Sequence, residues 1–120
     1  MLLVFYPFAF SGICTGELCE LRDNLEEFEA AGVTLLGISC DSVFAQKAWT
    51  AQEGFEFDLL SDFWPHGDVA RAYGVLDEDN GLALRGSFLL DADGIVRWSV
   101  VNPRGQRRDL DGYRRALEQL

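Results

Sequence analysis

Two thiols lie five residues apart in the segment YPFAFSGICTGELCELRD, where an apolar run gives way to a helical pattern. Cys14 falls near the predicted start of the helix, and Cys19 follows further along it. The free N–H groups and the positive end of the helix dipole favour a thiolate there, and the thiolate is the nucleophilic form. A lone cysteine at such a place is more often a buried structural residue, so its neighbours must decide between the two interpretations.

Three further residues have side chains suited to assist a reactive thiol: Pro7, Ser11 and Arg85. Pro7 fixes the backbone ahead of the loop and has no N–H group. The Ser11 hydroxyl can cap the helix, donate to a thiolate or accept a proton from a reactant. Arg85 keeps its charge and could lower the pKa of Cys14 while it binds an oxyanion. The alternatives are a simple helix cap for Ser11 and a surface salt bridge for Arg85.

Apolar runs, helical periodicity and turn residues predict the elements that would position these side chains. Strands are predicted at residues 2–6, 33–40, 55–60, 86–90 and 95–101. Helices are predicted at residues 12–31, about 42–53, 68–74 and about 108–120. In the second helix, Phe44, Ala48 and Trp49 are expected to face the core.

Strand–helix–strand–helix followed by a hairpin and a last helix predicts an α/β fold with a mixed central sheet and helices on both faces. The dipeptide Asp93-Gly94 is a hairpin signal between the last two strands. A strand, a cysteine at the mouth of a helix and a closing hairpin together indicate a thioredoxin-like architecture. Residues 1–120 are expected to form one such domain.

The net charge of −10 opposes binding to a nucleic-acid backbone. No apolar stretch approaches the roughly 18 residues that a membrane span requires. The N-terminal run MLLVFYPFAF lacks the basic residues of a signal peptide and is interpreted as a buried strand. Three cysteines are too few and too odd in number for a disulfide scaffold, which predicts reduced thiols in the cytoplasm.

The spacing Pro-x-x-x-Ser-x-x-Cys, from Pro7 to Cys14, resembles the active-site motif of the peroxiredoxins. The segment GLALRGSFLLDADG resembles the arginine-bearing segment of that family and puts Arg85 at its second catalytic position. GELCELRD and LLSDFWPHGDVARAYGV are similar to the AhpE-like branch. The resemblance covers nearly the whole chain.

This resemblance implies a thiol-dependent, antioxidant peroxidase. The Cys14 thiolate would attack a peroxide and become a sulfenic acid, Ser11 and Arg85 would hold the two oxygens, and Pro7 would shield the product from water. No metal or organic cofactor is implied. The implied partners are hydrogen peroxide or an organic hydroperoxide, a reductant (thioredoxin, a mycoredoxin-type protein or a low-molecular-weight thiol) and a second copy of the chain in a homodimer.

Cys19 is predicted to be the resolving cysteine. Five residues along an intact helix place the two Cα atoms roughly 8–9 Å apart, beyond the usual disulfide limit of about 7 Å. A Cys14–Cys19 disulfide would therefore require local unwinding. The spacing is similar to that of the bacterioferritin comigratory protein (PrxQ) branch, whereas the AhpE-like branch often lacks this thiol and works with one cysteine. A half-buried helical cysteine is the alternative.

Two further residues have open interpretations. Cys40, at the end of the second strand, is a core residue or a second resolving thiol. Glu17 is expected in the first turn of the helix, where it favours the dipole but would oppose a thiolate.

Peroxiredoxins usually carry a β-hairpin before the motif strand, which this chain is expected to lack as an N-terminally truncated form. An inactive fragment is therefore one alternative to a peroxidase. A thioredoxin-type thiol–disulfide oxidoreductase, which would share the fold, is another. The latter normally uses Cys-x-x-Cys, whereas Cys14 is followed by TGELC.

Overall fold

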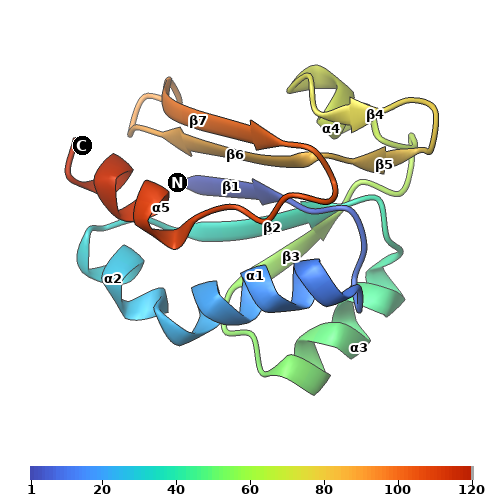
Figure 1. Ribbon diagram of the computed structural model, residues 1–120, viewed down its shortest axis with the longest axis horizontal. Coiled ribbons are helices and arrows are strands. Elements are labelled where there is room, and N and C mark those ends of the chain that lie inside the picture. The colour runs from blue at the N-terminus through green and yellow to red at the C-terminus, as the bar shows by residue number, and fades with distance from the viewer. Residues whose placement is uncertain (120) are drawn as a thin grey trace.

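The computed structural model describes residues 1–119. Its main sheet has the strand order β3-β2-β1-β6-β7 (Figure 1). The strands span β1 (Leu2–Phe5), β2 (Leu35–Ser39), β3 (Asp58–Ser61), β6 (Arg85–Leu90) and β7 (Val96–Asn102). Strand β1 pairs in parallel with β2 and antiparallel with β6, which confirms the predicted mixed sheet.

Helices cover both faces of this sheet, as predicted. One layer is formed by α1 (Gly12–Asp23), α2 (Leu25–Ala30), α3 (Val43–Glu53) and α5 (Leu110–Leu117). The opposite face carries the short helix α4 (Asp68–Ala72) and the small hairpin of β4 (Leu76–Asp77) and β5 (Leu82–Ala83) (Figure 1). Successive side chains of a strand point to opposite faces, so Leu2 and Val4 join the first core cluster while Leu3 and Phe5 join the second.

The expected single helix over residues 12–31 is wrong, because it is two helices that meet at Asn24. The backbone of Asn24 leaves the helical region, with φ −118° and ψ 17°. Its side-chain amide instead donates to the carbonyl of Glu20 at 2.8 Å. Asparagine competes with helical hydrogen bonds through such local contacts. The break separates the cysteine-bearing helix α1 from α2.

The orientation predicted for α3 is correct for Trp49 and wrong for two other residues. Trp49 is fully buried, whereas Phe44 is 84% exposed and Ala48 is also exposed. The helix buries Gln46 instead, whose amide donates to the carbonyl of Leu60 at 2.7 Å. A polar side chain can occupy this core position because β3 offers it a hydrogen-bond partner.

The hairpin of β4 and β5 was not predicted, because its strands have only two residues each. The third predicted strand also begins later, at Asp58. No helix among residues 1–119 is long and apolar enough to cross a membrane.

The sheet register brings the distant parts of the candidate site together. Val4 of β1 pairs with Ser87 of β6 in an antiparallel ladder. Two residues further along this register, Arg85 comes beside the end of β1. The chain leaves β1 there, and α1 begins at Gly12. Arg85 and the start of α1 therefore meet at one end of the sheet.

Candidate active site

The loop between β1 and α1 is held by Asp41, which follows β2. The Asp41 Oδ2 atom accepts from the backbone N–H of Ala9 at 2.8 Å and from the Ser39 hydroxyl at 2.7 Å. Phe10 has a φ of +69°, a left-handed conformation that bulky residues rarely adopt. Such backbone persists only where the surroundings hold it. Asp41 is thus a positioning residue that the sequence did not reveal, because its contact with Ala9 crosses more than thirty positions.

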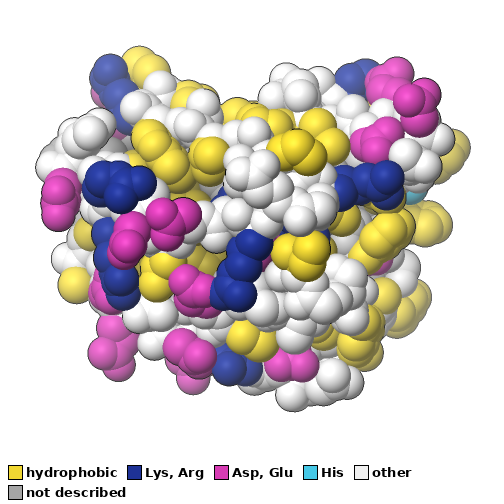
Figure 2. All heavy atoms as spheres, viewed as in Figure 1, with side chains coloured by type: hydrophobic (Ala, Val, Ile, Leu, Met, Phe, Trp, Pro, Cys, Tyr) yellow, Lys and Arg dark blue, Asp and Glu magenta, His cyan; other side chains and the backbone are white. Residues whose placement is uncertain are grey.

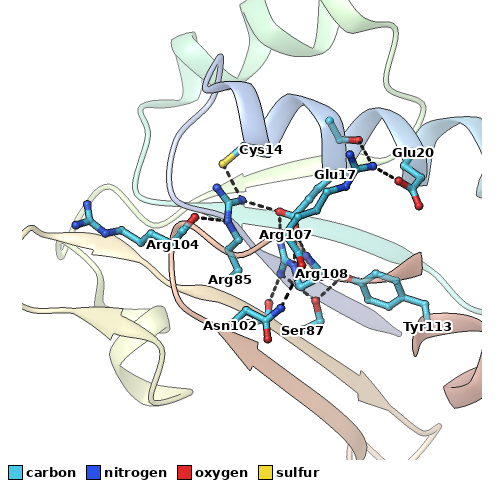
Figure 3. Close-up of polar contacts among 12 residues, drawn as sticks. Cys14, Glu17, Glu20, Arg85, Ser87, Asn102, Arg104, Arg107, Arg108 and Tyr113 are labelled. Atoms are coloured by element: carbon cyan, nitrogen blue, oxygen red, sulfur yellow. Dashed lines mark hydrogen bonds and ion pairs between the residues drawn. The ribbon is translucent and has the colours of Figure 1, made fainter. Parts of the chain in front are cut away.

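Cys14 lies in the first turn of α1 and is fully buried. Its Sγ atom lies 3.2 Å from Nη1 of Arg85, which reaches it from β6 (Figure 3). Arg85 is 3% exposed, and its Nε donates to the carbonyl of Arg104 at 2.6 Å. The structure therefore joins two residues that the family resemblance singled out in separate segments, and the surface salt bridge considered for Arg85 is wrong.

Glu17 is not in the first turn of α1, and it does not stand alone against the sulfur of Cys14. Its carboxylate is buried between two guanidinium groups (Figure 3). Nη1 of Arg85 donates to Oε1 at 2.6 Å, and Nε of Arg108 donates to Oε2 at 2.9 Å. Burial raises the pKa of Glu17, but the hydrogen bonds and charge of Arg108, together with the charge of Arg85, outweigh burial and hold this pKa below its usual value. Glu17 thus orients Arg85.

The charges of this cluster do not cancel without the sulfur. Arg85 and Arg108 bring two positive charges, and Glu17 brings one negative charge. The buried group therefore has one net positive charge, which a thiolate at Cys14 would balance. The cluster thus gives the sulfur of Cys14 a cationic environment, and an unbalanced charge is costly in a buried site.

Arg108 ties the cluster to the last helix. It is 5% exposed, and its Nη1 donates to the carbonyl of Gly86 at 2.8 Å and to the Ser87 hydroxyl at 2.9 Å. The Ser87 hydroxyl is also 2.8 Å from the hydroxyl of Tyr113 on α5. In the sequence, Arg108 sits in QRRDL, where nothing distinguishes it from the exposed Arg107. Sequence reasoning therefore missed it.

A pocket of about 250 Å³ opens in front of Arg85. Its lining is made of Pro7, Phe8, Ser11, Gly12, Ile13, Arg85 and Arg104. The Ser11 hydroxyl is buried and has no hydrogen-bond partner among the described residues. Ser11 holds the N-cap position of α1, yet its side chain makes no capping bond, so the simple capping interpretation is wrong. The pocket thus brings Pro7, Ser11 and Arg85 together.

The other two cysteines have different surroundings. The Cys19 thiol donates to Oε2 of Glu53, at the end of α3, over 3.2 Å. Burial and this bond raise the pKa of Cys19. Cys40 is buried, and burial together with Asp62 and Asp41 raises its pKa to about 11. All three cysteines are free thiols.

Comparison with known proteins identifies the family of the chain. Residues 1–99 match the family model described as AhpC/TSA family. The chain is 49% identical over 120 residues to alkyl hydroperoxide reductase E of Mycobacterium tuberculosis (strain H37Rv), covering all of this chain and 78% of the relative. It is 35% identical over 127 residues to the chloroplastic 2-Cys peroxiredoxin BAS1 of Hordeum vulgare, covering all of this chain and 60% of that protein.

A solved structure shares the fold. The crystal structure of Enterococcus faecalis AhpC superimposes with a TM-score of 0.91 at 32% identity, over 98% of this chain and 72% of that one. The fold is therefore thioredoxin-like, as predicted, and the chain belongs to the AhpC/TSA family of peroxiredoxins. The expected resemblance to the AhpE-like branch is also confirmed.

Proposed function

We propose that this protein is a thiol-dependent peroxidase in which Cys14 is the peroxidatic residue. The observation that carries the proposal is the 3.2 Å contact between Cys14 Sγ and Arg85 Nη1 inside a buried cluster of net positive charge. Membership of the AhpC/TSA family supports the same reaction class. A stabilised thiolate beside an anion-binding guanidinium is the arrangement that nucleophilic attack on an O–O bond requires.

In the reaction, the Cys14 thiolate attacks the terminal oxygen of hydrogen peroxide or an organic hydroperoxide. The S–O bond forms as the O–O bond breaks, so the sulfur is oxidised and the peroxide is reduced. The proton of the attacked oxygen passes to the leaving oxygen, which departs as water or an alcohol. Arg85 stabilises the charge that spreads along the O–O bond, and the unpartnered Ser11 hydroxyl holds the second oxygen. Pro7, in the pocket wall, shields the sulfenate from water.

Cys19 then resolves the sulfenic acid. Both cysteines lie in one continuous helix, Gly12–Asp23, so a direct bond requires the first turns of α1 to unwind. The resulting disulfide returns to the dithiol through an external thiol, for which thioredoxin, a mycoredoxin-type protein and a low-molecular-weight thiol are the proposed classes. The cytoplasm is the proposed location, because three cysteines are too few and too odd in number for the disulfide scaffold of a secreted protein.

A homodimer is the proposed assembly. Five aromatic side chains are 49% to 84% exposed: Phe8, Phe10, Phe44, Phe63 and Trp64. Figure 2 shows hydrophobic side chains gathered along the right-hand edge of the view, beside the starts of α1 and α3. Contiguous apolar surface of this kind is typical of an interaction site. Sedimentation velocity should show a dimer that Trp64→Ser weakens.

Intact-mass and thiol analysis after one equivalent of peroxide tests the mechanism in wild type, Cys14→Ser and Cys19→Ser. We expect a loss of about two mass units in wild type, corresponding to a disulfide, and none in either variant. A gain of about sixteen units at Cys14 in wild type would instead indicate a one-cysteine enzyme. A folded protein in which Cys14 does not react would refute the peroxidase proposal and support an inactive fragment.

A further inference from the structure

Cys19 and Arg22 of α1 each contact Glu53 at the end of α3. Its thiol donates to Glu53 Oε2 at 3.2 Å. One helical turn further, Nη1 of Arg22 donates to the main-chain carbonyl of Glu53 at 2.6 Å and lies 3.7 Å from Oε2. The Glu53 side chain is only 20% exposed, so the contact with Cys19 is partly shielded from water. One side of α1 is therefore attached to the last residue of α3.

We propose that Glu53 is a positioning residue that restrains Cys19 in the reduced enzyme and slows its attack on oxidised Cys14. The inference rests on the proposed function, in which Cys19 is the resolving thiol. It assigns Glu53 a role in the timing of resolution that is separate from the chemistry at Cys14, whose charged partner is Arg85.

The chemistry of resolution explains why this contact would cause a delay. The Cys19 thiolate must attack the sulfenic sulfur of Cys14. An S–S bond then forms, the S–O bond breaks, and the departing hydroxide takes a proton to become water. Cys19 is oxidised and the sulfenic sulfur is reduced. A carboxylate can accept a hydrogen bond from the thiol but repels the thiolate, so Glu53 favours the unreactive form.

The other charges around Cys19 do not reverse this effect. Arg22 favours the thiolate, whereas Asp23 on the same helix and Glu53 on α3 both oppose it. Burial acts in the same direction as the two carboxylates, and together they raise the pKa of Cys19. Cys19 must also leave Glu53 before it can approach Cys14, because the two sulfurs have partners on different elements.

A slow resolving step would prolong the life of the sulfenic acid. During that interval an external thiol can reduce Cys14 directly, or a second peroxide can oxidise it further. Glu53 would therefore set the balance between a one-cysteine and a two-cysteine cycle in the same chain.

Glu53→Gln tests this inference, with Glu56→Gln as the matched control. Glutamine keeps the shape of Glu53 and the main-chain contact with Arg22 but removes the charge. Glu56 is exposed and lies three residues further along the chain. After one equivalent of hydrogen peroxide, the rate of disulfide formation is measured by quenching and mass analysis between pH 5 and about 9. The rate of Cys14 oxidation in the same samples serves as the reference.

We expect the disulfide to form about threefold to tenfold faster in Glu53→Gln near pH 7, with its pH midpoint shifted to lower pH. Glu56→Gln should match wild type. A purely structural role would change the rate without moving the midpoint. An unchanged rate in Glu53→Gln overturns the inference, and a slower rate overturns it in favour of Glu53 as a base for Cys19.

A second measurement is independent of peroxide. In a Cys14→Ser background, site-resolved alkylation by iodoacetamide should modify Cys19 faster and with a lower pH midpoint when Glu53 is replaced by Gln. If Cys19 is alkylated at the same rate and with the same pH midpoint with and without Glu53→Gln, the proposed restraint by Glu53 is overturned. If Cys14 is oxidised and no disulfide forms in any variant, resolution by Cys19 fails and the inference fails with it. If the disulfide forms at equal rates in wild type and Glu53→Gln, only the role of Glu53 fails.

Discussion

Cys14 and Cys19 lie five residues apart on α1, and each sulfur is within hydrogen-bond distance of one charged side chain. Cys14 faces the Arg85 guanidinium, in a buried cluster with net positive charge. Cys19 faces the Glu53 carboxylate and is half-buried. The first environment is cationic, and the second raises the pKa of the Cys19 thiol.

This difference shows that the helix alone does not make a cysteine reactive. Cys14 gains from the first turn, where the free N–H groups lie, but its charged partner comes from β6, far along the chain. Cys19 receives its partner from α3. The tertiary neighbours therefore give the two thiols opposite electrostatic environments, which supports the proposed attack on peroxide by Cys14 and the proposed later step at Cys19.

The largest effect is expected when Arg85, the cation that faces Cys14, is replaced. Arg85→Gln should slow the oxidation of Cys14 by peroxide about a hundredfold to a thousandfold, because it removes the donor both to the sulfur and to the reacting oxygens. Stopped-flow fluorescence with hydrogen peroxide measures the second-order rate constant. Arg97→Gln, at an exposed ion pair with Asp91, is the charge-matched control and should react like wild type. If Arg85→Gln reacts with peroxide at the wild-type rate, the charge that Cys14 faces does not determine its reactivity.

A second prediction concerns the carboxylate that holds the cluster. Glu17→Gln leaves Arg85 and Arg108 buried without their counter-charge and should lower the free energy of unfolding by about 3 kcal/mol. Glu20→Gln, which breaks only the exposed pair with Arg107, should cost less than about 1 kcal/mol. Urea unfolding at pH 7 measures the free energy of unfolding of both variants. Equal losses in both variants would show that Glu17 is no more important than a surface charge.

The Glu17 carboxylate also predicts how the stability of the protein changes with pH. Because the folded-state pKa of Glu17 lies below its usual value of 4.5, its contribution to stability is present above that pH and is lost as the pH falls towards the lowered value. Wild type should therefore lose more stability than Glu17→Gln between pH 5 and about 3. Parallel curves from urea unfolding across this range would contradict the buried ion pair.

A smaller effect is expected where the cluster meets α5. Tyr113→Phe removes the hydroxyl that pairs with Ser87 at 2.8 Å and should cost about 1 kcal/mol. Ser87→Ala should cost more, since it also removes an acceptor of Arg108. A double-mutant cycle by chemical denaturation measures the coupling. Strict additivity would show that the two hydroxyls do not interact.

The smallest effect is expected at the third thiol. Because burial and two nearby carboxylates raise the pKa of Cys40 to about 11, it is almost entirely protonated at neutral pH. Cys40→Ala should change the rate of disulfide formation by less than about twofold. Mass analysis after one equivalent of peroxide gives this rate. Loss of the disulfide in Cys40→Ala, with its retention in Cys19→Ser, would transfer the resolving role to Cys40.

Local patterns predicted much of the fold. The apolar runs located β1, β2 and β6 within a few residues, because buried strands require continuous apolar sequence. The turn signal Asp93-Gly94 helped to locate β7, whose side chains are exposed or half-buried. The break at Asn24 was missed, since it depends on one side-chain bond within an otherwise helical pattern. The direction of Phe44 was also wrong, because α3 turns Gln46 towards a carbonyl of β3 rather than presenting an apolar residue there.

The candidate site also contains residues that the sequence identified and residues that it missed. The family resemblance identified Pro7, Ser11 and Cys14 from one motif and Arg85 from a separate segment, and the structure brings them to one end of the sheet. Arg108 and Asp41 were missed, and Glu17 was misjudged, because their roles come from contacts with residues far along the chain. Nothing in the local sequence carries that information.

The sequence by itself determined the fold class and the helix that carries two thiols, because these follow from periodicity and turn residues. It also identified the residues of the reactive motif, through their resemblance to a known family. Only the tertiary structure decided which charge each thiol meets. Arg85 and Glu53 reach α1 from a strand and a helix that fold against it from later in the chain. Electrostatic interactions act over a few ångströms in space, so sequence distance could not reveal that one sulfur faces a cation and the other an anion.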